Sequence, residues 1–235
     1  MLAIYKKELR SYFIGPIGYI YIASFLLVSS LIFVYTNLYQ GTTDITNYYT
    51  FLLYLFAILI PLLTMRMLSE EKKSKTEQIL LTSPVSLPSI ILAKFFAAYT
   101  LFAGTLLISC LNFAALFYDN SEPNMAIVVS TTIGILLIGS AFVAIGIFVS
   151  ACTENQLISA LLTMVAIAGS LAISAVSGNV TFTPLRVVLR WFSIFDRFYA
   201  FTYGYFDFVS LIYYLSLTVI FLFLTVRVFE KRRWE

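Results

Sequence analysis

Long apolar runs separated by short polar stretches dominate the chain, and six of the runs are long enough to cross a membrane as helices. A helix rises about 1.5 Å per residue, so roughly 20 apolar residues span the hydrocarbon core of a bilayer. The predicted spans cover residues 17–36, 48–68, 89–117, 125–150, 157–176 and 210–229. The third and fourth exceed the required length, and we expect tilt or protrusion to absorb the excess.

Residues 1–15 show the pattern of an amphipathic helix. Leu2, Tyr5 and Leu9 recur at helical spacing, and Gly15 followed by Pro16 ends the pattern. The charged positions between the apolar ones are Lys6, Lys7, Glu8 and Arg10. We expect this helix to lie in the inner membrane interface.

Residues 69–84, between the second and third spans, hold the most concentrated charge. Ser69 suits a helix N-cap, and acidic residues follow it in the first turn. Glu71 and Lys75 stand at i,i+4 in the favourable order. The apolar end and the stop consist of Ile79, Leu80, Leu81 and Pro84. The residues alone fit equally a short helix that docks in a partner's groove and a solvated loop.

Residues 183–208 are too charged to span a membrane and too aromatic for a solvated loop. The residues that set this character are Arg186, Arg190, Trp191, Arg197 and a run of Phe and Tyr. Aromatic side chains favour the headgroup level, so we expect one or two short helices in the outer leaflet. An aromatic connector packed on its own spans is an equal alternative.

Composition places the chain among membrane proteins. It is 60% hydrophobic and 11% charged, whereas soluble proteins carry about 25% charged residues. The net charge of +3 is too small to favour a nucleic-acid patch. With two cysteines and no histidine, the chain is a poor candidate for a zinc or haem site.

Basic residues fall mainly on one side of the predicted membrane. That side holds Lys6, Lys7, Arg10, Arg66, Lys72, Lys73, Lys75, Lys94, Arg227, Lys231, Arg232 and Arg233. The loops on the other side carry Asp44, Asp119 and Glu122, and only the segment 183–208 adds arginines there. The positive-inside rule then predicts that both termini are cytoplasmic.

The sequence shows no residues that would supply the energy for transport. No Asp, Glu, Lys or Arg lies in mid-span, since Arg66 and Lys94 fall near cytoplasmic ends, where long side chains reach water. No phosphate-binding G-x-x-x-x-G-K-[ST] motif occurs. Asp196 and Asp207 make a weak candidate for a catalytic pair, and no residue is predicted to be catalytic or metal-binding.

The segment "IPLLTMRMLSEEKKSKTEQILLTSPVS" resembles ABC-2 type transporter permeases, especially the gliding-motility-type group. The family pattern is P-x-x-T-M-R-x-x-x-E-E, a basic pair, and then G-T-x-E-x-L-L-T-x-P. The matching residues are Pro61, Thr64, Met65, Arg66, Glu70, Glu71, Thr76, Glu77, Leu80, Leu81, Thr82 and Pro84. Lys75 departs from the pattern, because the family commonly has glycine there.

Supporting likeness covers nearly the whole chain. It includes "IYKKELRSYFIGPIGYIY" near the N-terminus, "SACTENQLISA" between the fourth and fifth spans, and residues 212–234. The middle motif contains a short inner loop formed by Thr153, Glu154, Asn155 and Gln156.

The resemblance implies an all-α membrane protein in which residues 1–235 form one ABC-2 type transmembrane domain. Residues 69–84 would be the coupling helix, moved by a separate ATP-binding subunit that holds ATP and magnesium. Residues 1–15 would lie on the inner face, and residues 183–208 would cap the outer end. Two such permeases form a homo- or heterodimer in the bacterial inner membrane. Such systems are generally exporters, and some have an accessory subunit with an extracytoplasmic domain.

Two other functions are weaker alternatives. A membrane scaffold that transports nothing could recruit a cytoplasmic partner through the same segment 69–84. An intramembrane enzyme is least consistent with the residues, because no general base pairs with a nucleophile. We therefore expect a permease subunit that has no enzymatic activity and holds no cofactor of its own.

Overall fold

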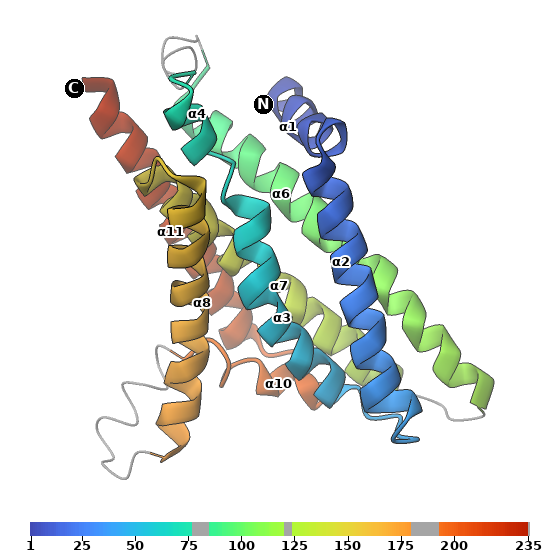
Figure 1. The fold of residues 1–235 in the computed structure, drawn as a ribbon. Coiled ribbons are helices and arrows are strands. Elements are labelled where there is room, and N and C mark those ends of the chain that lie inside the picture. Colours follow the sequence, from blue (N-terminus) through green and yellow to red (C-terminus); the bar gives the residue numbers. More distant parts are fainter. Residues whose placement is uncertain (77–84, 120–123, 180–192, 235) are drawn as a thin grey trace.

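The computed structural model describes residues 1–76, 85–119, 124–179 and 193–234, which are almost entirely helical and contain no strand (Figure 1). The six helices long and apolar enough to cross a membrane confirm the predicted fold class. They are α2 (Pro16–Phe33), α3 (Thr46–Thr64), α6 (Leu87–Ser109), α7 (Met125–Cys152), α8 (Gln156–Asn179) and α11 (Phe208–Trp234).

Shorter elements complete the described chain. They are α1 (Leu2–Ile14), α4 (Ser69–Lys73) and α10 (Tyr199–Thr202). A π-helical turn (Val34–Leu38) extends α2, and a 3-10 segment (Cys110–Asp119) extends α6. These extensions lengthen the first and third spans to Pro16–Leu38 and Leu87–Leu116, close to the predicted ranges.

Local sequence explains where the long helices begin. Pro16 occupies the first position of α2, where its missing N–H costs nothing. The starts of α7, α8 and α11 have side-chain caps. Asn124, Asn155 and Asp207 each accept a hydrogen bond from the backbone N–H two residues later, at 3.0, 2.9 and 3.1 Å.

The bundle is built around α7. The apolar part of α7 is 72% buried, compared with 17% for α8 and 28% for both α2 and α11. Glycines let neighbours approach α7 closely: a Cβ on Gly139 would lie 2.1 Å from the Phe102 ring, and one on Gly146 would lie 2.2 Å from Thr64 Oγ1. The outer helices therefore present most of their apolar surface outward.

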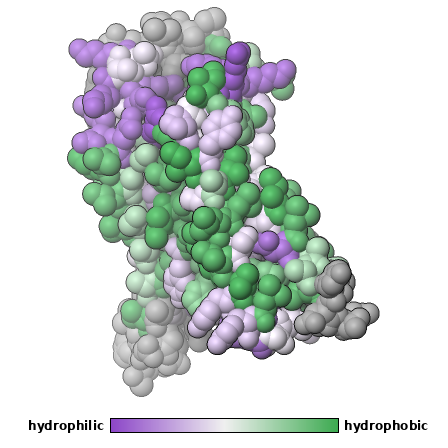
Figure 2. Space-filling model, turned by 45° about the vertical axis from the view of Figure 1, so that its right-hand side comes forward, coloured by the Kyte–Doolittle hydropathy of each residue, from purple (hydrophilic) through white to green (hydrophobic). Residues whose placement is uncertain are grey.

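Polar groups gather at one end of the bundle. Both termini and α4 lie at this end, and α10 lies at the other (Figure 1). Hydrophilic residues cover the first end, and a broad apolar band lies beneath them (Figure 2). The arrangement agrees with the grouping of residues 1–15 and the start of 69–84 on one side of the membrane. That this side is cytoplasmic stays a prediction.

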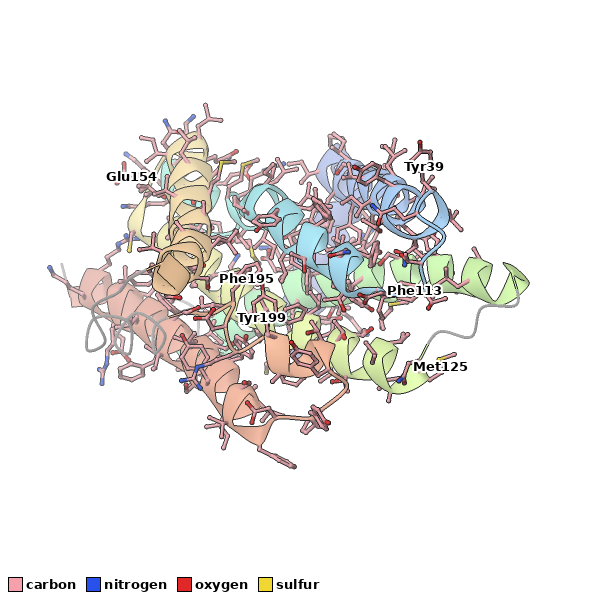
Figure 3. All side chains as sticks on the ribbon, turned by 90° about the horizontal axis from the view of Figure 1, so that it is seen from below. Tyr39, Phe113, Met125, Glu154, Phe195 and Tyr199 are labelled. Atoms are coloured by element: carbon pink, nitrogen blue, oxygen red, sulfur yellow. The ribbon has the colours of Figure 1, made fainter. Side chains whose placement is uncertain are left out.

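The described part of the aromatic connector packs on its own bundle, as the second interpretation predicts. Phe195, Phe198 and Phe201 are 5%, 1% and 0% exposed, and Phe201 lies against Gly134 of α7. Seen from below, Phe195 and Tyr199 lie near the centre of the bundle (Figure 3), and Tyr199 remains 46% exposed. The Arg197 guanidinium lies 4.2 Å from the centre of the Tyr213 ring. Arg186, Arg190 and Trp191 lie outside the described residues.

Asp207 caps α11, and its contribution should vanish in acid. Its carboxylate accepts hydrogen bonds from the Ser210 hydroxyl and the Val209 and Ser210 backbone, which lower its pKa below the ordinary 3.8. A carboxylate whose pKa is lower in the folded state stabilises the fold at pH values above its unfolded-state pKa. This stabilisation is lost as the pH falls through the folded-state pKa. We expect Asp207→Ala to cost about 1 kcal/mol at neutral pH. Thermal unfolding should show no such cost well below pH 3.8, and a pH-independent cost would contradict this assignment.

Candidate functional site

A buried lysine joins three elements at the polar end of the bundle. Lys94 of α6 is 1% exposed. Its Nζ lies 2.7 Å from Glu71 Oε1 and 3.1 Å from Glu8 Oε1, and it donates a 3.0 Å hydrogen bond to the Met67 carbonyl. These partners satisfy all three ammonium protons. The prediction that Lys94 reaches water is wrong, because α1 and α4 cover it.

Two carboxylates and two ammonium groups meet in the Lys94 cluster, but only one of the ammonium groups is buried. Two carboxylates face one ammonium, and Lys7 Nζ lies 3.7 Å from Glu8 Oε1 at the rim. Glu71 Oε2 is buried without a hydrogen-bond partner. The predicted i,i+4 pair of Glu71 with Lys75 is therefore wrong, since Glu71 pairs with Lys94. Buried ion pairs of this kind tolerate the loss of one partner poorly.

A single hydroxyl fastens the start of α4 to α7. The backbone N–H groups of Leu68 and Ser69 donate to Ser150 Oγ at 3.2 and 3.1 Å. The same hydroxyl donates to the Met65 carbonyl at 3.2 Å. Ser150 is 0% exposed, so water cannot replace these bonds.

Two further ion pairs surround this connection. Arg66 binds Glu70 through two parallel bonds, Nε to Oε2 at 2.6 Å and Nη2 to Oε1 at 2.8 Å. Lys72 Nζ lies 3.0 Å from Glu154 Oε1, which joins α4 to the turn between α7 and α8. The element α4 is thus attached to α1, α6, α7 and the α7–α8 turn.

The predicted helix 69–84 is shorter than expected in its described part. It ends at Lys73, and Lys75 takes a φ of +58°, a left-handed conformation that glycine adopts more easily. This is the position at which the pattern that the sequence resembles has glycine, and in this chain lysine takes the left-handed conformation there. The N-cap prediction is also wrong by one residue: Leu68 holds that position, and the Ser69 hydroxyl donates back to the Met65 carbonyl.

A cavity of about 370 Å³ lies between α1 and the chain from α3 to α4. Its polar lining includes Glu8, Arg66, Glu70 and Glu71. At its apolar side Tyr12 donates a 3.0 Å hydrogen bond to the Leu63 carbonyl. Burial raises the pKa of the Tyr12 hydroxyl, so it remains a neutral donor.

The structure brings together most of the predicted inner-side residues that it describes. Thr153, Glu154, Asn155 and Gln156 form the α7–α8 turn, and Thr76 lies beside Ser74 with their hydroxyls 2.9 Å apart. Lys6 and Arg10 are exposed on α1, away from the cluster. The remaining predicted residues, Glu77, Leu80, Leu81 and Pro84, lie outside the described residues.

Sequence reasoning missed two residues that matter most to this site. Lys94 stands out only as a lone charge eight residues into an apolar helix, and Ser150 only as the first residue of the inner-loop motif. The aspartates considered as a catalytic pair have separate structural roles, because Asp196 accepts from Ser177 Oγ at 3.1 Å and Asp207 caps α11. Within the described ranges, no three metal-binding side chains form a group.

Removing the Ser150 hydroxyl should loosen α4 without disturbing the spans. We expect Ser150→Ala to cost about 1–3 kcal/mol, because two buried N–H groups lose their acceptor. Thermal unfolding should show the loss, and hydrogen exchange should show faster exchange at Leu68 and Ser69. The matched control is Ser216→Ala, an exposed serine whose hydroxyl bonds only within its own helix. Equal effects of the two changes would contradict the proposed anchor.

Comparison with protein families gives one match. The model of the ABC-2 family transporter proteins matches residues 9–229, which include α1 from Leu9 onward, the first five long helices and α11 as far as Phe229. They also include Lys94 and Glu71, but not Glu8. A comparison with curated proteins finds no match to the chain. The gliding-motility-type subgroup stays a prediction.

Proposed function

This chain belongs to the ABC-2 family of transporter proteins, and we propose that it lines the translocation pathway of an ATP-driven exporter as one half of a dimer. A separate ATP-binding subunit would contact α4 and supply ATP and magnesium. The polar end of the bundle would then face the cytoplasm of a bacterium. The cargo would be lipidic or amphipathic, because the span interiors lack free charges.

The observation that carries the proposal is the set of attachments around α4. A push on this five-residue helix would pass to α6 through Lys94, to α7 through Ser150 and to the α7–α8 turn through Glu154. A solvated loop of ordinary surface charges would not need a buried lysine and a buried serine to hold it. The arrangement suits an element that receives force from outside and transmits it to the spans.

A charge exchange at the Lys72–Glu154 pair tests this function. The pair is partly exposed, at 22% and 70%, so breaking it should cost only about 0–1 kcal/mol of stability. The permease would be co-expressed with the proposed ATP-binding subunit and placed in vesicles with a fluorescent phospholipid analogue. We expect Lys72→Glu and Glu154→Lys each to reduce ATP-driven movement of the analogue, and the double variant to recover it.

A different result would favour the scaffold. If the unaltered complex hydrolyses ATP but moves neither this analogue nor other amphipathic probes, the exporter proposal is wrong. If it transports, but both single variants transport like the unaltered protein, the exporter stands and the role of α4 is wrong. Mass measurement of the gently solubilised complex would test the dimer separately.

A further inference from the structure

An apolar groove lies between α1 and α6, separate from the cavity beside Glu8. Its volume is about 410 Å³, and its lining consists of Met1, Leu2, Tyr5, Ala93, Phe96 and Thr100. The two hydroxyls in this lining already bond to each other, Tyr5 to Thr100 Oγ1 at 3.1 Å. The groove therefore suits an apolar ligand such as a hydrocarbon chain, because its lining has little need of a polar partner.

Two exposed cations follow the groove residue Leu2 along α1. Lys6 and Arg10 are exposed and lie at i,i+4, one helical turn apart on the same side of α1. Leu2 of the groove precedes Lys6 by the same spacing, so the three follow one ridge of the helix. Neither cation pairs with a described carboxylate, whereas Lys7 lies 3.7 Å from Glu8. The ridge thus leads from the apolar lining of the groove to two cations that pair with no carboxylate in the described part of the chain.

The position of the groove suits a membrane lipid. The groove lies between α1 and α6, and α1 lies at the polar end of the bundle (Figure 1). An apolar band begins beneath the hydrophilic residues of this end (Figure 2). Leu2 and Ile14 of α1 are 68% and 75% exposed, as expected for a helix that lies in the membrane interface. A lipid beside α1 would have its acyl chains at the depth of Phe96 and its headgroup near Lys6.

We propose that this groove is a binding site for one anionic phospholipid. An acyl chain lies against Leu2, Ala93 and Phe96, and the phosphate accepts hydrogen bonds from Lys6 and Arg10. A zwitterionic lipid fills the groove but leaves the positive charge uncompensated, so the site prefers a net negative headgroup. The bound lipid would hold α1 against α6 and keep Lys94 covered. The site does not depend on the proposed transport function.

Native mass spectrometry of the full chain tests the site. The protein would be released from micelles containing equal amounts of phosphatidylglycerol and phosphatidylcholine with identical acyl chains. We expect selective retention of phosphatidylglycerol. Each cation should contribute roughly fivefold to affinity, so Lys6→Ala with Arg10→Ala should weaken retention about 25-fold. The matched control is Lys73→Ala with Lys75→Ala, which removes the same charge from exposed positions at the same end and should change little.

Two further arms separate the possible occupants. Thr100→Trp fills the groove from an exposed position and leaves both cations, and we expect it to abolish selective retention. Soluble glycerol phosphate should not displace the lipid, because it lacks the acyl chain. The proposal is overturned by equal retention of both lipids, by equal loss in the two double-alanine variants, or by displacement with glycerol phosphate. It is also overturned if a second copy of the chain or another protein occupies the groove in place of lipid.

Discussion

Replacing Lys94 with methionine is expected to destabilise the protein by about 3–5 kcal/mol, because the two carboxylates lose their shared buried cation and only the exposed Lys7, 3.7 Å from Glu8 Oε1, remains nearby. Glu8 Oε1 and Glu71 Oε1 lie 3.1 and 2.7 Å from the ammonium that would be lost. Methionine keeps most of the length and apolar volume of the side chain, so the loss would reflect charge rather than a cavity. Thermal unfolding in detergent measures it.

Two companion variants make this prediction specific. Lys73→Met removes the same charge from an exposed position on α4 and should change stability by less than about 0.5 kcal/mol. Combining Lys94→Met with Glu8→Gln and Glu71→Gln removes the charges together and should restore most of the stability. If the charged cluster also transmits movement, this neutral variant should fold but transport poorly. A mild effect of Lys94→Met alone would show that the lysine is not part of a buried ion pair.

Adding one methyl group to α7 at Gly146 is also expected to destabilise the protein strongly. In Gly146→Ala the new Cβ would lie 2.2 Å from Thr64 Oγ1 and 2.8 Å from Thr64 Cβ. Thr64 is 0% exposed, and its hydroxyl donates a 3.0 Å bond to the Ile60 carbonyl, so its side chain has no open space. Overpacking of this kind costs about 1–3 kcal/mol. Thermal unfolding measures the cost directly.

The displacement caused by Gly146→Ala should reach α4. Ser150 follows Gly146 by one helical turn, so separating α3 from α7 would stretch its bonds to Leu68 and Ser69. Hydrogen exchange at those two amides should therefore rise. Thr64→Ala in the same chain should recover part of the stability. The control is Gly104→Ala, where an added Cβ meets nothing within 4 Å, and a cost as large as that of Gly146→Ala would contradict the explanation.

The six spans could be predicted because the required signal is local. Apolar length alone sets a span, and caps such as Asn124 and Asp207 mark helix starts within a few residues. The pair of Arg66 and Glu70 also follows from its i,i+4 spacing, but the same spacing predicts a pair of Glu71 with Lys75, whereas Glu71 pairs with Lys94. Spacing shows which charged residues can pair within one helix, but it does not show which of them will instead pair with a residue of a distant helix.

The centre of the site depends on contacts between distant segments. Lys94 is buried because α1 and α4 fold over it. Its partners on these helices, Glu8 and Glu71, lie 86 and 23 residues away along the chain. Nothing in the residues next to Lys94 distinguishes this outcome from an extended side chain that reaches water. The length of α4 could not be predicted for a similar reason. Lys75 takes a left-handed backbone conformation that lysine disfavours, and the surrounding turn holds it there.

The unequal burial of α7 and α8 has a consequence for how such chains diverge. Leu161 and Val165 of α8 are 61% and 67% exposed. By contrast, neighbouring side chains leave no room for a Cβ atom on Gly139 or Gly146 of α7. Substitutions among apolar residues on the outer face of α8 leave the interior untouched. Sequence differences between relatives should therefore accumulate first on this face of α8. Such changes could adapt the protein to a new lipid environment or a new neighbour while the interior of the bundle stays constant.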